Sequence, residues 1–186
     1  MMNLIAAGAV FSAALYGQAV NQRREKQQDR VAQGISSGQL TAGETTRIER
    51  QEAGVSRQIH QDRSANGGTL TQAERQQVNR EQNRMSGEIY RDKHNANQTN
   101  FRGEVGARQG VQQQRIAQGV HSGSLTAGET ARAERKETGV NREVRADRAQ
   151  NGGALTPQER GQVNRQQNRL SGQIYRAKHN AARQPK

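Results

Sequence analysis

The stretch Gly38-Gln39-Leu40-Thr41-Ala42-Gly43-Glu44 recurs three more times in this chain, over residues 68–74, 123–129 and 153–159. Each copy reads Gly-x-Leu-Thr-x-x-Glu, a pattern that starts helices. The Thr at the N-cap accepts a hydrogen bond from the N3 amide, and the N3 Glu accepts one from the Thr amide. The Gly suits the left-handed position that closes a preceding helix. The motif predicts helical hairpins capped by Thr41 and Glu44, Thr71 and Glu74, Thr126 and Glu129, and Thr156 and Glu159.

From Arg23 onward the chain is a duplication with a period of 85 residues. The run Ile-Tyr-Arg-Asp-Lys-His-Asn over residues 89–95 returns as Ile-Tyr-Arg-Ala-Lys-His-Asn over residues 174–180. Because no gap is needed to align the copies, the two units should share one fold. We predict one unit over residues 23–95, a linker over 96–106 and a second unit over 107–181.

Each unit is expected to hold three helices, which in the first unit cover about residues 23–36, 42–64 and 72–94. Connections of a few residues imply antiparallel neighbours, so the fold class is all-α, two tandem three-helix units of helical hairpins. The apolar residues form a narrow seam, and Leu40 and Leu70 are expected to pack on another helix. Gly54 and Gly87 interrupt the seam; close helix crossing, a kink or marginal helices would each account for them.

The composition is strongly polar, with 30% hydrophobic and 3% aromatic residues and a formal net charge of +12. Composition alone favours disorder, because such a chain buries little and repels itself. The regular caps and the spacing of the apolar residues instead favour thin helices with a sparse core, completed by an assembly. We expect no enzyme, no cofactor and no metal site. The absence of Cys excludes disulfides and thiolate metal sites.

Residues 2–19 form an uncharged apolar stretch that precedes Arg23 and Arg24. This stretch resembles a secretory signal peptide, with Gly17 and Ala19 before the cleavage point, although no Lys or Arg precedes it. An uncleaved anchor and a helix used for self-association are the alternatives. We therefore assign residues 1–19 to a signal peptide or N-terminal apolar segment, and expect export to the periplasm or the extracellular space.

The last predicted helix is basic on one face, and no acidic residue follows Glu159. At 100° per residue its arginines fall within an arc of about 40°, opposite its apolar residues. The first unit has a similar row, diluted by acidic residues. Arginine binds phosphate and carboxylate groups, so these rows predict a polyanion-binding surface, whereas an ordinary solvated face is the alternative. The predicted binding residues are Arg80, Arg84, Arg91, Arg165, Arg169, Arg176, Lys178 and Arg183.

Two further motifs suggest metal sites but have simpler explanations. His94 and His179 lie in predicted last turns, where they favour the helix dipole, and no second His lies at ligand spacing. Residues 62–74 resemble an EF-hand calcium loop, yet Glu74 falls one position too late and Ala149 replaces Ser64 in the second unit. A helix-cap turn explains the same residues, so calcium binding is a minor alternative.

Together, Gly-x-Leu-Thr-x-x-Glu and Asn-Arg-x-x-Asn-Arg-x-Ser-Gly-x-Ile-Tyr-Arg-x-Lys-His-Asn resemble the motifs of a family of exported bacterial helical-repeat proteins without an established activity. The resemblance covers nearly everything after Arg23 and implies an envelope or extracellular location. We predict a non-enzymatic exported interaction protein whose basic helix faces bind nucleic acid or an acidic envelope polymer. The alternative is a structural protein that assembles into a homo-oligomer, fibre or array through stacked repeats.

Overall fold

The computed structural model describes residues 7–184 of the 186-residue chain, with side chains from residue 19 onward. This part of the chain contains six helices and no strand, which confirms the all-α prediction. The helices are α1 (Ala7–Ser37), α2 (Ala42–Ala65), α3 (Gln72–Lys93), α4 (Gly103–His121), α5 (Ala127–Gln150) and α6 (Pro157–Lys178).

The first helix is longer than predicted. α1 begins at Ala7 and not near Arg23, so the latter part of the apolar segment forms one continuous helix with the first repeat. Residues 1–6, the start of the predicted signal peptide, lie outside the described residues. Among the helices that the structure describes, none combines the length and the apolar character needed to cross a membrane. In the second repeat, α4 begins at Gly103, inside the predicted linker.

All four Gly-x-Leu-Thr-x-x-Glu motifs form complete capping boxes. In each box the Thr hydroxyl accepts a hydrogen bond from the Glu amide at 3.3 Å. The Gly before the first box, Gly38, has a φ of +74° and ends α1, after which the Leu40 amide donates to the Gly34 carbonyl at 2.9 Å. Because these contacts are local, each motif both closes one helix and begins the next.

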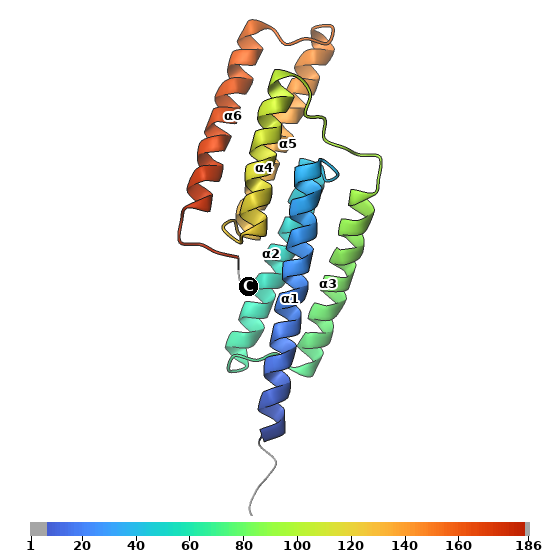
Figure 1. Ribbon diagram of the computed structural model, residues 1–186, viewed down its shortest axis with the longest axis vertical. Coiled ribbons are helices and arrows are strands. Elements are labelled where there is room, and N and C mark those ends of the chain that lie inside the picture. Colours follow the sequence, from blue (N-terminus) through green and yellow to red (C-terminus); the bar gives the residue numbers. More distant parts are fainter. Residues whose placement is uncertain (1–6, 185–186) are drawn as a thin grey trace, which may run out of the picture.

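The two repeats pack together as a single elongated bundle (Figure 1). The most extensive helix contacts join the repeats: α2 packs against α5, and α1 packs against α4. These four helices form the centre of the bundle, and α3 and α6 lie at its opposite edges (Figure 1). Each repeat has too few apolar residues to form a full core alone. The missing apolar contacts therefore come from the other repeat of the same chain.

The apolar core is split into three clusters along the bundle. The central cluster takes residues from both repeats, including Leu40 and its counterpart Leu125, each 1% exposed. Leu70 belongs to a smaller cluster at the outer end of the first repeat, and Leu155 packs against the matching cluster of the second. Both predicted leucines thus pack on other helices.

Buried glutamines supplement this thin core. The Gln27 side chain donates to the Gln82 carbonyl at 2.7 Å and to the Ser86 hydroxyl at 2.8 Å, which ties α1 to α3. Gln112 makes the same pair of bonds between α4 and α6 in the second repeat. Hydrogen bonding allows these polar groups to take core positions that apolar residues would otherwise occupy.

The glycines that interrupt the seam do not mark close helix crossings. A Cβ atom added at Gly54 or Gly139 would meet no other atom within 4 Å, and one at Gly87 would meet only the Arg91 guanidinium at 3.5 Å. The close approach lies elsewhere: a Cβ at Gly34 would fall 2.6 Å from the Leu40 side chain. The crossing explanation was therefore wrong, because the tight contact is between a helix end and the leucine that follows it.

Candidate polyanion-binding surface

The arginine row on α6 lies on the outer face of the bundle. Arg165, Arg169 and Arg176 are exposed and take part in no ion pair within residues 7–184. On the opposite face of this helix, Val163 and Leu170 are buried. The helix thus packs through one side and presents free guanidinium groups on the other, as its sequence predicts.

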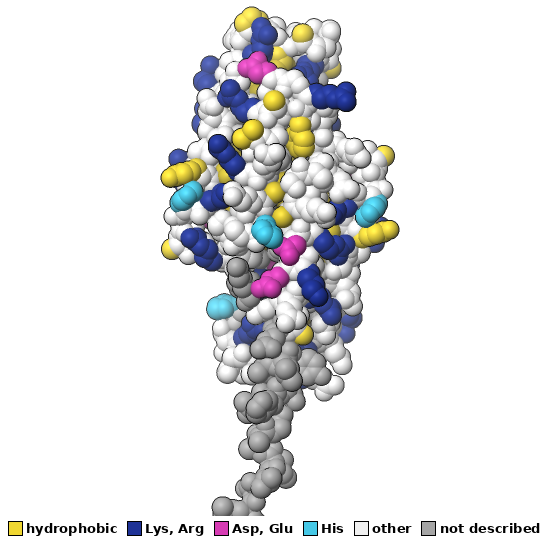
Figure 2. Space-filling model, viewed as in Figure 1, with side chains coloured by type: hydrophobic (Ala, Val, Ile, Leu, Met, Phe, Trp, Pro, Cys, Tyr) yellow, Lys and Arg dark blue, Asp and Glu magenta, His cyan; other side chains and the backbone are white. Residues whose placement is uncertain are grey.

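The matching row on α3 lies at the other edge of the bundle. Arg80, Arg84 and Arg91 are exposed, and they too lack an ion pair in the described part of the chain. Figure 2 shows lysine and arginine side chains along both edges of the visible face, with few carboxylate side chains among them. The two rows therefore form separate basic edges.

Two of the predicted residues do not extend these rows. Lys178 is half-buried and donates to the Gln118 side chain of α4 at 2.8 Å. Burial, followed by the charge of Arg115, lowers the pKa of Lys178. Arg183 lies beyond the end of α6 at Lys178, so it cannot share the helical arc, and its guanidinium donates to the Asn180 and Ala182 carbonyls.

An exposed aromatic pair stands at the end of each row. Tyr90 stacks on His94 with ring centroids 4.2 Å apart, and Tyr175 stacks on His179 at 4.1 Å. The tyrosines are 57% and 62% exposed, which is unusual for side chains of this size. The histidines form the C-caps of α3 and α6. Such rings offer stacking surfaces beside guanidinium groups.

The loop that resembles an EF-hand is organised as a helix cap. The Asn66 side chain donates to both Glu74 carboxylate oxygens, at 3.0 and 2.9 Å, and the Thr71 amide donates to the same carboxylate at 2.7 Å. Hydrogen-bond donors therefore occupy the oxygens that a calcium ion would need. No group of three His, Cys, Asp or Glu residues within residues 7–184 is placed to hold a metal ion.

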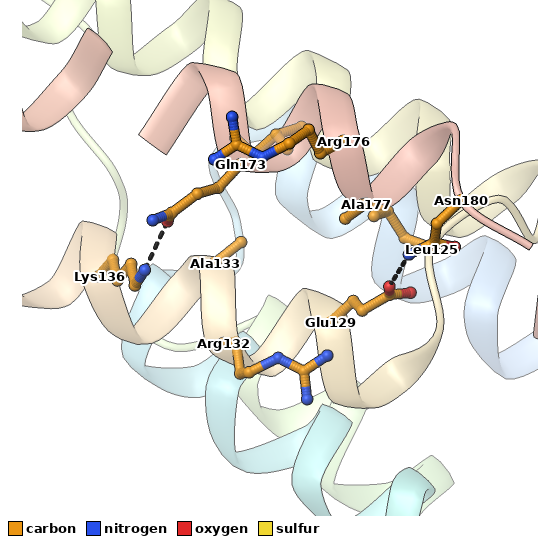
Figure 3. Close-up of a pocket in the computed structure, with 10 residues that line it drawn as sticks. Leu125, Glu129, Arg132, Ala133, Lys136, Gln173, Arg176, Ala177 and Asn180 are labelled. Atoms are coloured by element: carbon orange, nitrogen blue, oxygen red, sulfur yellow. Dashed lines mark hydrogen bonds between the residues drawn. The ribbon is translucent and has the colours of Figure 1, made fainter. Parts of the chain in front are cut away.

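A groove of about 350 Å³ runs between α5 and α6 (Figure 3). Ala133 and Ala177 lie along it, between two hydrogen bonds that close its ends (Figure 3). At one end Lys136 donates to Gln173 at 2.5 Å, and at the other Asn180 donates to Glu129 at 2.6 Å. The remaining lining residues are Leu125, Arg132, Ile174 and Arg176.

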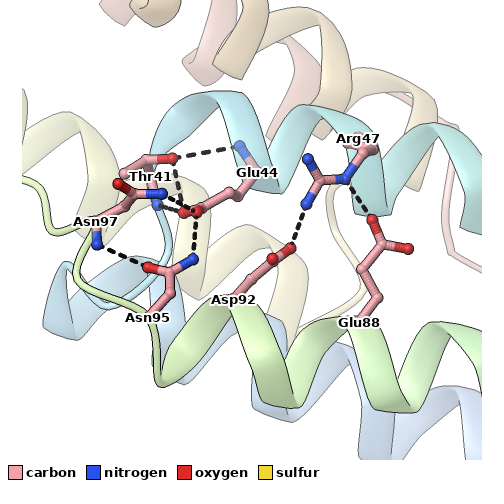
Figure 4. A network of polar contacts seen from close by, with 7 residues as sticks. All are labelled: Thr41, Glu44, Arg47, Glu88, Asp92, Asn95 and Asn97. Carbon is pink, nitrogen blue, oxygen red and sulfur yellow. Dashed lines mark hydrogen bonds and ion pairs between the residues drawn. The ribbon is translucent and has the colours of Figure 1, made fainter.

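The equivalent place in the first repeat carries a closed ion-pair network (Figure 4). The Arg47 guanidinium donates to Glu88 and, at 2.6 Å, to Asp92. Beside it, the Asn95 and Asn97 side chains donate to Glu44 at 2.8 and 3.1 Å (Figure 4).

Burial alone would raise the pKa of Glu44, but its bonds to Thr41, Asn95 and Asn97 outweigh burial and lower it. Glu44 therefore stays ionised and joins the start of α2 to the segment that follows α3.

A set of buried carboxyl groups lies on the two central helices α2 and α5. Glu49, Glu52, Glu134 and Glu137 are each 0% exposed, and no local sequence pattern indicates their burial. Arg24 pairs with Glu52 at 2.7 Å. Gln109 stands 85 positions after Arg24, so the second repeat has no cation there, and within the described chain both Glu137 oxygens lack a hydrogen-bond partner.

Three of these carboxyl groups, Glu49, Glu134 and Glu137, have raised pKa values. Burial raises the pKa of Glu134 to about 7, against a lowering effect of the Gln113 hydrogen bond. Burial, with the Glu134 charge second, raises the pKa of Glu137 to about 8. Burial and then Glu52 also raise the pKa of Glu49. They are enclosed by protein, so they belong to the packing of α2 against α5 and not to the surface.

Fold and surface together define an all-helical bundle of two repeats with a basic row at each edge. Comparisons of the chain with protein-family models, curated proteins and solved structures find no match. The likeness to exported helical-repeat proteins therefore stays a prediction.

Proposed function

We propose that this protein binds an acidic polymer, without catalysis, through the arginine rows of α3 and α6. The observation that carries the proposal is that Arg165, Arg169 and Arg176 are exposed without a carboxylate partner in the described chain. Unpaired guanidinium groups at one edge of a protein with a net charge of +12 attract phosphate or carboxylate polymers. The export predicted from residues 1–19 would make an envelope polymer or extracellular nucleic acid the partner.

The aromatic pairs favour a polymer that carries rings. Tyr175 and His179 adjoin Arg176, and Tyr90 and His94 adjoin Arg91. A base stacks on such a ring with about 1–3 kcal/mol, and the neighbouring guanidinium holds the backbone. Single-stranded nucleic acid is therefore the first polymer to test, and an acidic polysaccharide the second.

Charge reversal of the α6 row tests the proposal. The variant Arg165→Glu, Arg169→Glu, Arg176→Glu should bind a fluorescent single-stranded oligonucleotide more weakly than the wild type, as measured by anisotropy at several salt concentrations. If each arginine contacts one phosphate, the slope of log K against log salt should fall by about 2, at roughly 0.7 per contact.

The matched control reverses three exposed arginines of α2 and α5, namely Arg50, Arg57 and Arg135. It changes the net charge equally, so it should keep most of the wild-type slope. Equal losses in the two variants would show that overall charge alone drives binding. Undetectable binding of the wild type to both DNA and acidic polysaccharide would refute the proposal.

The structural alternative, assembly into a fibre or array, has less support. The seams that would drive stacking are covered inside the chain by the α2–α5 and α1–α4 contacts.

A further inference from the structure

The duplication allows the α5–α6 groove to be compared with its own counterpart. Residues 85 positions apart occupy matching places, so Arg132 corresponds to Arg47. In the first repeat, Glu88 and Asp92 bind Arg47 (Figure 4). In the second repeat, these two carboxylates are replaced by Gln173 and Ala177. Arg132 has therefore lost both partners that its counterpart uses.

The replacements also open space. Ile48, fully buried in the first repeat, corresponds to Ala133, whose smaller side chain lies along the groove. The shorter Ala177 stands where Asp92 reaches across, so the groove has an apolar floor (Figure 3). A pocket of about 350 Å³ is within the range that binds small molecules.

The lining of the groove is also more positively charged than the matching place in the first repeat. The groove has three cations, Arg132, Lys136 and Arg176, and one carboxylate, Glu129. The matching places in the first repeat hold two cations and three carboxylates, because Gln51 replaces the lysine and Glu44, Glu88 and Asp92 are present.

Glu129 offsets only one of the three cations, and its carboxylate is fixed at the end of the groove. It accepts hydrogen bonds from the Thr126 amide and hydroxyl at 3.0 and 2.8 Å, and from Asn180 at the groove end. Arg132, Lys136 and Arg176 form no ion pair within residues 7–184. Burial alone would raise the pKa of Glu129, but its hydrogen bonds lower it, and the Arg132 charge only adds to their effect.

We propose that the α5–α6 groove binds a small dicarboxylate, whose two carboxylates take the places that Glu88 and Asp92 occupy beside Arg47. Guanidinium groups bind carboxylates through paired hydrogen bonds, and the alanine floor fits a short methylene chain. The site is independent of polymer binding: it takes one small molecule inside the groove and shares only Arg176 with the arginine row.

Glutarate is the probe, titrated into protein with ¹³C-labelled alanine methyl groups. The Ala133 and Ala177 signals should shift along a single saturable curve with one glutarate per chain. The variant Ala133→Ile, Ala177→Asp restores the residues of the first repeat, so it should bind at least ten times more weakly. Absence of a saturable shift at these methyl groups overturns the site. Inorganic phosphate at equal concentration should shift them far less, and an equal effect overturns the dicarboxylate assignment.

The reciprocal variant is a gain-of-function test that does not depend on losing a signal. Changing Ile48→Ala, Gln51→Lys, Glu88→Gln and Asp92→Ala gives the first repeat the residues of the second. It should raise the glutarate stoichiometry from one to two per chain, provided that circular dichroism shows the helices intact. If a folded variant still binds one, the residues named here do not form the site, and the proposal fails.

A third measurement separates this site from the polymer surface. Ala133→Ile alone fills the groove and leaves net charge and the arginine row unchanged. It should weaken glutarate binding at least tenfold and leave oligonucleotide affinity within twofold of the wild type. Parallel loss of both ligands would show that the groove is only part of the polymer surface.

Discussion

At the scale of residues, the two motifs that recur in the sequence turn out to be bonding partners. The Asn at the end of Tyr-Arg-x-Lys-His-Asn donates to the Glu of Gly-x-Leu-Thr-x-x-Glu: Asn95 to Glu44 at 2.8 Å, and Asn180 to Glu129 at 2.6 Å. The Glu therefore receives the cap bonds of its own helix and a bond from the end of another helix. This explains why both motifs occur in both repeats.

Replacing Asn180 by Ala should remove this link. A hydrogen bond to a charged group contributes about 1.5–3 kcal/mol when enclosed and less where water competes, so we expect a loss of roughly 1 kcal/mol in the free energy of unfolding. Urea unfolding followed by circular dichroism measures it. Asn79→Ala, at an exposed position of α3, is the control and should change stability little. Equal values for the two variants would contradict a role for the link.

Changing Gly54 or Gly34 to alanine should alter the stability of the protein in opposite directions. Gly54→Ala should stabilise the protein by up to about 1 kcal/mol, because the site is open and alanine favours helix. Gly34→Ala should destabilise it, because the new Cβ would lie 2.6 Å from the Leu40 side chain. Thermal unfolding of the two variants side by side is sufficient, and stabilisation by both changes would contradict the Leu40 contact.

At the scale of elements, the main contact between the repeats is made by helices that bury glutamate. α2 and α5 are the most closely associated pair, and each contributes two fully buried carboxyl groups, Glu49 and Glu52 from α2 and Glu134 and Glu137 from α5. Only Glu52 has an arginine partner among the described residues. Because burial raises the pKa of Glu49, Glu134 and Glu137, ionising these three groups should weaken the packing of α2 against α5.

Stability should fall as the pH rises through this range. Folding raises the pKa of Glu134 to about 7 and of Glu137 to about 8, so the folded protein binds more protons than the unfolded chain. Since the ordinary glutamate pKa is about 4.3, each group lowers the free energy of unfolding by about 1.4 kcal/mol per pH unit from there up to its folded pKa. Unfolding midpoints in urea, measured from about pH 5 to about pH 9, would show this slope.

The variant Glu137→Gln separates this effect from a general response to pH. An amide stays neutral, so the variant should lose less stability than the wild type between about pH 5 and about pH 8. Glu25→Gln, at an exposed position of α1, should keep the wild-type slope. A wild-type protein equally stable across the range would refute the burial of these carboxyl groups.

At the scale of the whole molecule, the two arginine rows face away from each other. α3 and α6 lie at opposite edges of the bundle, with the four central helices between them (Figure 1). A polymer strand bound at one edge leaves the other edge available. From the proposed polymer binding we therefore predict that one protein holds two strands, one at each edge, at a separation set by the bundle.

Bridging can be measured directly. With two oligonucleotides that carry a donor and an acceptor dye, the wild type should raise energy transfer at protein concentrations below saturation. The variant with the α6 row reversed should still bind one strand through Arg80, Arg84 and Arg91 but should not raise transfer. Transfer that persists in this variant would place both strands elsewhere on the surface.

Local features of this fold could be predicted from the sequence, because they depend on neighbouring residues. Thr41 and Glu44 are three residues apart, and the left-handed Gly38 is part of the same stretch, so helix ends were predictable. The start of α1 was not, because residues 2–19 match a signal peptide as well as a helix. The burial of Glu137 depends on a helix from the other repeat. Such a contact cannot be predicted from the residues next to Glu137.

The residue replacements that form the α5–α6 groove can be read from the aligned repeats, but the sequence alone does not identify the groove. Aligning the repeats shows Gln173 where Glu88 stands and Ala177 where Asp92 stands. In the sequence, these differences indicate only that acidic residues dilute the basic row of the first repeat. Only the structure shows that Glu88 and Asp92 bind Arg47. It therefore also shows that Arg132 lacks the matching carboxylates.

The contact between the repeats also bears on how the chain arose. A protein with only one repeat would leave the faces of α1 and α2 uncovered, and a second copy of itself would be the natural cover. The present chain corresponds to such a dimer made continuous by the segment between α3 and α4. Once joined, the halves no longer had to be identical. The halves do differ at matching positions: Arg24 and Asp92 of the first correspond to Gln109 and Ala177 of the second. Covalent joining thus released one half from the sequence constraints of self-pairing.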